Sequence, residues 1–167
     1  MSEHFRELAL AAPTAPLTLA LYQPDIPQNC GTLLRLCACL GLDAALIEPA
    51  GFPVSDRAFR RAGMDYLDHV TIMRHLNFAA FDGWRRAAGR RLVLLSTKAQ
   101  LPYGDFTFAP SDVLLVGRES AGVPEAVHAC ADARLVIPLR PAMRSLNVAV
   151  AAAMVVGEAL RQIQTMR

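Results

Sequence analysis

The stretch RLVLLSTKAQLPYGDFTFAPSDVLLVG, residues 91–117, decides the fold class. It begins and ends with apolar runs, RLVLLST (91–97) and DVLLVG (112–117), and the residues between them are loop-like. A continuous apolar run of this kind is typical of a strand that is buried on both faces of a parallel sheet. The stretch therefore predicts two buried strands of such a sheet.

Strand-like and helix-like segments alternate on both sides of this stretch. Further strands are expected at 17–22, 42–49, 67–72 and 134–138, and helices at 30–41, 56–63, 77–89, 123–131 and 144–164. The alternation predicts an α/β domain in which helices flank a mostly parallel sheet of about five or six strands. Residues 1–16 contain two prolines and no sustained pattern, so we expect a flexible leader there and a single domain over 17–167.

The composition excludes several classes of protein. Of the 167 residues, 53% are hydrophobic and 19% are charged, which allows a sizeable core and argues against disorder. The longest nearly apolar stretch, 146–157, is too short to span a bilayer, and the first residues, MSEHFRELAL, do not form a signal peptide. We therefore exclude a membrane protein, a secreted disulfide scaffold and a fibrous protein, and expect a cytoplasmic one.

The cysteines and basic residues are less informative. The cysteines lack CxxC spacing and lie in apolar surroundings, so we expect buried thiols rather than zinc ligands or disulfides at Cys30, Cys37, Cys39 and Cys130. There are 17 basic and 15 acidic residues, and Lys98 is the only lysine. Arginine suits phosphate recognition, but a GC-rich genome also favours arginine codons. We attribute the excess of arginine over lysine mainly to the genome.

The motifs of several common enzyme classes are absent from the sequence. No G-x-G-x-x-G, no P-loop and no G-x-S-x-G occurs, which excludes the usual dinucleotide, nucleotide and hydrolase sites. The four histidines are scattered, so we expect no metal site. What remains are three turn-forming motifs after strands: IPQNCGTLLR (26–35), VGRESAGVP (116–124) and IPLRPAMRSLN (137–147). Each alone is an ordinary turn or helix start, but together they lie where α/β sheets bind ligands.

The closing segment, 144–164, predicts a helix that is apolar on nearly all sides before Glu158. A sheet covers only one side of such a helix. We therefore favour a second subunit as the other cover, and a well-buried helix in a monomer is the alternative.

The three motifs, in this order and at these distances, resemble the RNA 2'-O-ribose methyltransferases of the SPOUT (α/β-knot) superfamily. LALYQPDIPQNCGTLLRLCACLG (19–41), followed by LIEPAGF (46–52) and RRAGMDY (60–66), most resembles the single-domain tRNA (cytidine/uridine-34) 2'-O-methyltransferases. The resemblance covers Leu17 to about Gln164. It implies a C-terminal deep trefoil knot, S-adenosylmethionine as cofactor, the tRNA anticodon stem-loop as substrate, a homodimer, and no metal.

The resemblance also implies roles for individual residues. The implied cofactor wall comprises Leu95, Gly117, Glu119, Ile137, Leu139, Ser145 and Leu146. The implied catalytic set is Arg35, Asn29, Ser145 and Asn147. Arg35 is assigned to the 2'-hydroxyl, where it acts as base, stabilises the developing alkoxide, or holds the adjacent phosphate.

Candidate RNA contacts follow from the same resemblance. The implied arginines are Arg57, Arg60, Arg61, Arg140 and Arg144, with bases stacking on Tyr66 or Phe52. Arg85, Arg86, Arg90 and Arg91 form a second basic cluster, with a solvated face as the alternative. Gln23 and Ala121 depart from the family pattern, and Ala121 removes a possible phosphate contact and leaves the exact RNA substrate open. The competing functions are methylation of another tRNA position or of rRNA, RNA binding without catalysis, and small-molecule chemistry.

Overall fold

The computed structural model describes residues 15–54, 61 and 64–165. These residues form a seven-stranded sheet in the order β3-β2-β1-β6-β4-β7-β5, and every pair of neighbouring strands in it is parallel. The strands are β1 (Thr18–Tyr22), β2 (Asp43–Ile47), β3 (Ile72–His75), β4 (Leu92–Leu95), β5 (Leu101–Pro102), β6 (Val113–Val116) and β7 (Ala133–Val136). The predicted α/β class with a mostly parallel sheet is confirmed.

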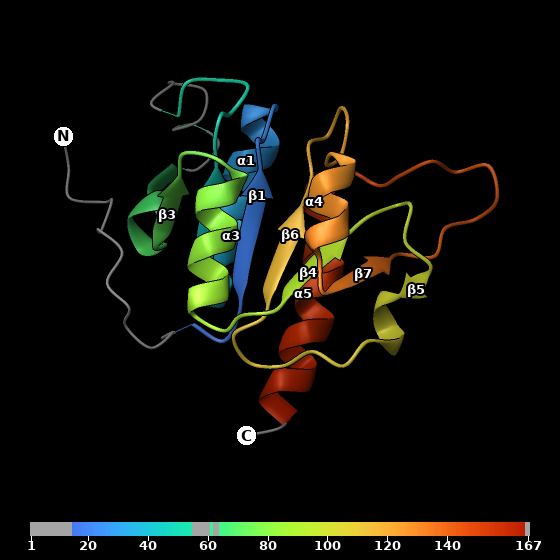
Figure 1. Ribbon diagram of the computed structural model, residues 1–167. Helices are drawn as coiled ribbons and strands as arrows, with labels where there is room; N and C mark the ends of the chain where they lie inside the picture. The colour runs from blue at the N-terminus through green and yellow to red at the C-terminus, as the bar shows by residue number, and fades with distance from the viewer. Residues whose placement is uncertain (1–14, 55–60, 62–63, 166–167) are drawn as a thin grey trace.

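Helices cover both faces of the sheet (Figure 1). They are α1 (Pro27–Leu40), α3 (Phe78–Ala87), α4 (Glu125–Cys130) and α5 (Val148–Thr165), with short 3-10 helices η1 (Met64–His69) and η2 (Tyr103–Asp105). Side chains alternate along β1, so that Leu19 and Leu21 pack on the face of α1 and α5, while Ala20 packs on the face of Phe81 from α3. The sheet therefore separates two apolar cores.

Local sequence explains where two of the helices begin or end. Pro27 occupies the first turn of α1, where its missing N–H costs no hydrogen bond. The same helix ends at Gly41, whose φ of 69° is left-handed and whose N–H donates to the Cys37 carbonyl. At the start of α3, the Asn77 side chain accepts the Ala80 N–H at 2.8 Å.

Four sequence-based expectations about the elements were wrong. The helix expected at 30–41 begins three residues earlier, at Pro27. Residues 67–69 are the end of η1, and the strand β3 begins only at Ile72. The stretch taken as loop contains β5, which extends the sheet to seven strands. The closing helix begins at Val148 rather than at residue 144, because Asn147 caps it with its side-chain oxygen. The expected helix at 56–63 lies almost wholly outside the described residues.

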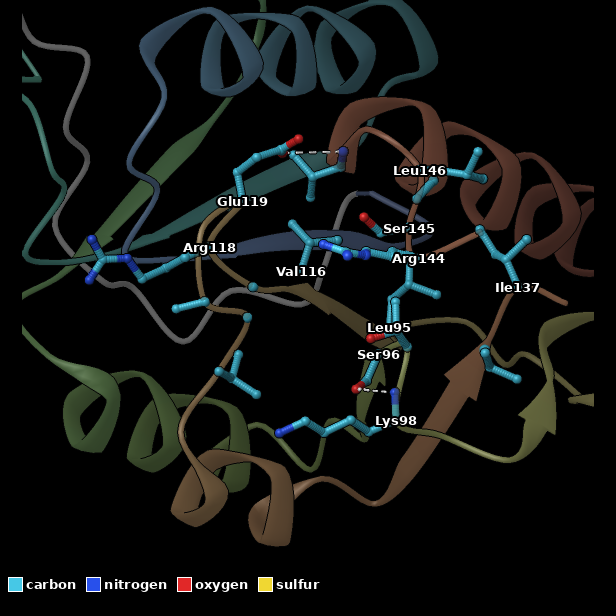
Figure 2. Close-up of a pocket in the computed structure, with 18 of the residues that line it drawn as sticks. Leu95, Ser96, Lys98, Val116, Arg118, Glu119, Ile137, Arg144, Ser145 and Leu146 are labelled. Carbon is cyan, nitrogen blue, oxygen red and sulfur yellow. Dashed lines mark hydrogen bonds between the residues drawn. The ribbon is translucent and has the colours of Figure 1, made fainter. Parts of the chain in front are cut away.

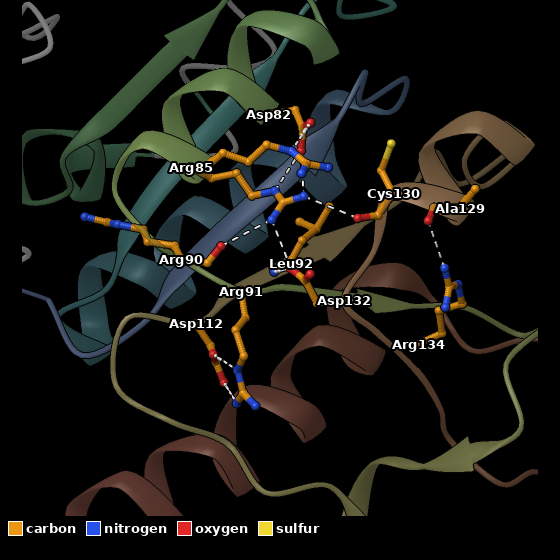
Figure 3. A network of polar contacts seen from close by, with 11 residues as sticks. Asp82, Arg85, Arg90, Arg91, Leu92, Asp112, Ala129, Cys130, Asp132 and Arg134 are labelled. Carbon is orange, nitrogen blue, oxygen red and sulfur yellow. Dashed lines mark hydrogen bonds and ion pairs between the residues drawn. The ribbon is translucent and has the colours of Figure 1, made fainter.

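The expected second basic cluster is instead part of the fold (Figure 3). The Arg85 side chain is only 4% exposed and pairs with Asp82 at 2.7 Å and Asp132 at 2.9 Å. Asp132 also accepts the Leu92 N–H at the start of β4. Arg85 is therefore available neither to bind RNA nor to form part of a solvated surface.

The neighbouring arginines belong to the same end of the sheet. Arg91 makes a two-pronged contact with Asp112, at 2.7 Å for each nitrogen–oxygen pair. The buried Arg90 donates to the Thr18 hydroxyl at 3.0 Å. Since these partners lie at the amino ends of β1, β4 and β6, the arginines join strands that are far apart in sequence. Arg86 and Arg91 are exposed, at 60% and 44% of their side chains, whereas Arg85 and Arg90 are buried.

The thiols differ among themselves. Cys30 and Cys37 are buried, and burial raises the pKa of each to about 12. Cys39 is exposed and Cys130 half-buried, so the expectation of four buried cysteines was wrong for these two. Within the described part of the chain, no helix is long and apolar enough to cross a membrane.

Candidate active site

The main pocket lies at the carboxyl ends of β4, β6 and β7 and has a volume of about 360 Å³ (Figure 2). The segments after these strands form its walls, together with the loop before α5 and the first turns of that helix. Ligands bind at this end of open parallel sheets because the loops that follow the strands diverge there. All seven residues expected to form a cofactor wall line it, namely Leu95, Gly117, Glu119, Ile137, Leu139, Ser145 and Leu146.

One wall is a tight turn over residues 117–122. Arg118 and Gly122 exchange two backbone hydrogen bonds, of 3.0 and 2.9 Å, and Gly122 has a φ of 64°. A Cβ at Gly117 would lie 2.6 Å from the Gly122 carbonyl carbon, which no side chain tolerates. The two glycines therefore let the turn fold back on itself and present its backbone to the pocket.

A polar cluster joins the three sequence motifs at one edge of this pocket. Glu119 accepts the Asn29 side-chain N–H at 3.0 Å and the Val148 backbone N–H at 3.3 Å. The Asn29 oxygen in turn accepts the side-chain N–H of Asn147, also at 3.0 Å. Because Asn147 caps α5, one chain of hydrogen bonds connects α1, the 117–122 turn and α5. We call Asn29, Glu119 and Asn147 the amide–carboxylate cluster.

Arg144 and Ser145 precede this cluster on the loop that leaves β7. Figure 2 shows both side chains directed toward the pocket, whereas the Arg118 guanidinium points away from it. The structure thus places Ser145 in the pocket wall, and Arg144, which we expected to bind RNA, lies against the same cavity.

Arg35 is not part of this arrangement. It does not appear among the described residues that line the main pocket, and it lies about 9 Å along α1 from Asn29. Its guanidinium carbon lies 4.5 Å above the centre of the Tyr66 ring, and its Nη2 donates to the Tyr66 hydroxyl at 3.4 Å. One face of Tyr66, which we expected to stack on RNA bases, is therefore covered by Arg35.

The remaining arginines expected to bind RNA are only partly described. Arg57 and Arg60 lie outside the described residues, while Arg61 and Arg140 are exposed. Sequence reasoning missed Asp25 and Lys98. Lys98 lines the pocket just beyond β4, a position that strand-end reasoning could have found. Within the described ranges, no three His, Cys, Asp or Glu side chains are grouped as a metal site would require.

Comparisons with known proteins agree with this geometry. Residues 16–157 match the SpoU rRNA Methylase family. The chain is 79% identical over 145 residues to a tRNA (cytidine(34)-2'-O)-methyltransferase of Beijerinckia indica, which covers 87% of this chain and 91% of that protein.

Two solved structures are similar to the whole domain. One, described as "Structural insights into the 2-OH methylation of C/U34 on tRNA", superimposes with a TM-score of 0.83 at 42% identity, over 90% of this chain and 97% of that one. The other is an AdoMet-bound rRNA methyltransferase from Sinorhizobium meliloti, with a TM-score of 0.81 at 29% identity, over 88% of this chain and 58% of that one.

Proposed function

The chain belongs to the SpoU rRNA Methylase family, and from this premise we propose that it methylates the 2'-hydroxyl of the wobble nucleotide, cytidine or uridine 34, of tRNA. The observation that carries the proposal is the meeting of the three motifs around a single pocket through the amide–carboxylate cluster. Two proteins similar over most of the chain support this choice of substrate, since one is named for cytidine 34 of tRNA and the other is described with C/U34.

We propose S-adenosylmethionine as the cofactor of the main pocket. A cavity of about 360 Å³ is large enough for a ligand of this size. Leu95, Ile137 and Leu139 offer apolar walls to an adenine, and the 117–122 turn offers backbone hydrogen-bonding groups. The AdoMet-bound relative supports this assignment. When bound, the cofactor supplies a methyl group on a positively charged sulfur, so the reaction needs no metal.

The protein itself must align the ribose oxygen and favour loss of its proton. Ser145, on the pocket wall, and Asn29 and Asn147, at its edge, are placed to orient the ribose by hydrogen bonds. We propose that Arg35 supplies a positive charge and does not remove the proton, because a guanidinium stays protonated in proteins. It stabilises the developing alkoxide or holds the adjacent phosphate.

Arg35 does not line the main pocket of its own chain, and we propose a homodimer in which Arg35 of one subunit serves the other's pocket. The outer side of α5 supports this, since Val150 is 51% exposed and Met154 40% exposed. Apolar side chains in a row on one helix face are typical of a covered surface. Arg61, Arg140 and Arg144, with Arg57 and Arg60, are the proposed RNA contacts.

We further propose that residues 17–167 form one domain whose C-terminal segment makes a trefoil knot. The path of the chain supports this. After β7 the chain passes along the pocket and then returns, so that α5 packs against α1 and β6 on the far side of β4. The chain must therefore cross back over the sheet next to the 117–122 turn.

The test is methyl transfer from labelled S-adenosylmethionine into total tRNA from a strain that lacks this gene. Wild type, Arg35→Ala and the exposed control Arg86→Ala are compared, and the labelled nucleotide is mapped by digestion and mass spectrometry. We expect a 2'-O-methyl pyrimidine at position 34 with wild type and the control, and about a hundredfold less with Arg35→Ala.

The family name and the Sinorhizobium relative make rRNA the second candidate substrate. Ribosomal RNA is therefore included in the same assay. Label in rRNA but not in tRNA would overturn the wobble assignment and leave the methyltransferase class intact.

A further inference from the structure

Asp25 lies on the loop between β1 and α1, and its carboxylate binds the outside of the 117–122 turn. It accepts the backbone N–H of Glu119 at 3.1 Å and that of Ser120 at 3.4 Å. The Ser120 hydroxyl donates to the same carboxylate, and the Arg118 Nε lies 3.7 Å from it. The turn is more than 90 residues away in sequence, so these contacts exist only in the folded chain.

The surroundings hold Asp25 in place from the other side. The Gly51 N–H donates to the Pro24 carbonyl at 2.8 Å, and a Cβ at Gly51 would lie 3.0 Å from the Asp25 Cα. The Asp25 side chain is only 14% exposed. Burial raises the pKa of this carboxyl, but the hydrogen bonds from Ser120 and Glu119 outweigh burial and leave the pKa below its ordinary value.

These contacts and those of Asn29 form a two-point attachment. Asp25 binds the backbone of the turn, and Asn29, four residues later on the same segment, binds the Glu119 side chain. With only the second contact, the Glu119 backbone could rotate while its carboxylate stayed bound. With both contacts, the orientation of the turn relative to the pocket is fixed. The orientation of the Glu119 carboxylate, which accepts the Val148 N–H, is fixed as well.

We propose that Asp25 is a positioning residue, which holds the 117–122 turn and its Glu119 in the geometry that binds the methyl-donor cofactor. The inference rests on the proposed function, because it assumes that this pocket binds S-adenosylmethionine. Asp25 is not among the residues that line the main pocket, so it acts through the turn and its Glu119. Its loss therefore lowers affinity by disordering a wall of the pocket, and preorganised walls bind more tightly than mobile ones.

The experiment measures S-adenosylmethionine binding to the full chain by calorimetry, without tRNA. We expect Asp25→Ala to weaken binding about tenfold, since contacts with a charged group are stronger than neutral ones. Asp25→Asn keeps one acceptor and is expected to restore about half of that loss on a logarithmic scale. Ser120→Ala, which removes one contact only, is expected to weaken binding about twofold. Asp105→Asn, on η2, is the control and leaves affinity unchanged.

A double-mutant cycle separates positioning from general structural damage. If Asp25 acts through Glu119, Asp25→Ala weakens binding less than about twofold once Glu119→Ala is present. Hydrogen exchange supplies a readout without ligand: the Glu119 and Ser120 amides exchange about tenfold faster in Asp25→Ala, while amides in β6 do not change.

The outcomes distinguish the inference from the proposed function. Unchanged cofactor affinity in Asp25→Ala, or a full tenfold effect on the Glu119→Ala background, overturns the inference even if wild type methylates tRNA. Conversely, wild type that binds the cofactor but labels no nucleotide 34 contradicts the proposed function, while the affinity and exchange results still support Asp25.

Discussion

At the amino ends of the strands, arginines and aspartates pair with one another, whereas at the carboxyl ends an amide–carboxylate cluster borders a cavity. In the first set the charges pair with one another: Arg85 binds Asp132, and the buried Asp112 binds Arg91. The second set, Asn29, Glu119 and Asn147, is linked by bonds of similar length but borders the pocket.

Burial of the partners decides what such a network does. A buried charge pair contributes chiefly through the cost of leaving one member alone, so the amino-end network controls stability. An exposed cluster contributes little to stability, and its geometry matters for what enters the pocket. Substitutions at the two ends are therefore expected to separate folding from activity.

The largest effect on folding is expected from Arg85→Ala. It removes a side chain that is only 4% exposed, with its contacts to Asp82 at 2.7 Å and Asp132 at 2.9 Å, so we expect a loss of about 3 kcal/mol in the free energy of unfolding. Urea unfolding followed by circular dichroism measures it. Arg86→Ala, at the exposed neighbouring position, is the control. Activity per folded molecule should not change, and a selective loss of activity would break the comparison.

At the carboxyl end, Asn29→Asp tests the cluster by charge. It places a second carboxylate at the position that now donates to Glu119 at 3.0 Å, and two like charges at that distance cannot both stay ionised in their present positions. We expect about a hundredfold lower kcat/KM for tRNA, against about tenfold for Asn29→Ala. Unfolding midpoints within error of wild type are expected for both. Equal activity of Asn29→Asp and wild type would contradict the cluster's role.

Tyr66 tests whether its contact with Arg35 matters. Tyr66→Ala removes the ring beneath the guanidinium, and the loss of a cation–π contact is expected to lower kcat/KM about fivefold. Tyr66→Phe keeps the ring and loses only the long hydroxyl contact, so its activity should stay within about twofold of wild type. If both variants lose activity equally, the hydroxyl and not the ring is the important group.

The smallest effect concerns His75, which is buried against Phe81 and Trp84. Burial lowers the pKa of this imidazole from its ordinary 6.5. The unfolded chain therefore binds a proton at a higher pH than the native chain does, so the contribution of His75 to stability is complete above pH 6.5 and declines as the pH falls below it. His75→Phe should flatten the stability profile in this acidic range. A profile with unchanged slope would exclude His75 as its source.

Sequence patterns predicted those parts of the structure whose signal is local. The apolar runs at β4 and β6, the glycine that ends α1 and the three motifs after strands were all visible in the sequence, whereas the start of α1 at Pro27 was placed three residues too late. The short β5 was not, because Leu101–Pro102 carries no pattern of its own and is a strand only through its pairing with β7.

Long-range pairing explains the other errors. Arg85, Arg90 and Arg91 look like a basic surface until Asp132, Thr18 and Asp112 are brought beside them. A single acid such as Asp25 has no periodicity, and its meeting with the 117–122 turn depends on the order of strands in the sheet. The sequence also did not show that Arg35 lies outside the pocket. Its spacing from Asn29 indicates which face of the helix it occupies, but not which part of the molecule that face contacts.

The most direct measurement uses full-length tRNA assembled with a single 2'-deoxynucleotide. Methyl incorporation is compared for tRNA with ribose throughout, with 2'-deoxyribose at nucleotide 34, and with 2'-deoxyribose at nucleotide 32. We predict that substitution at 34 abolishes incorporation, whereas substitution at 32 leaves it close to that of unmodified tRNA. Undiminished incorporation into tRNA that lacks the 2'-hydroxyl at 34 would contradict it.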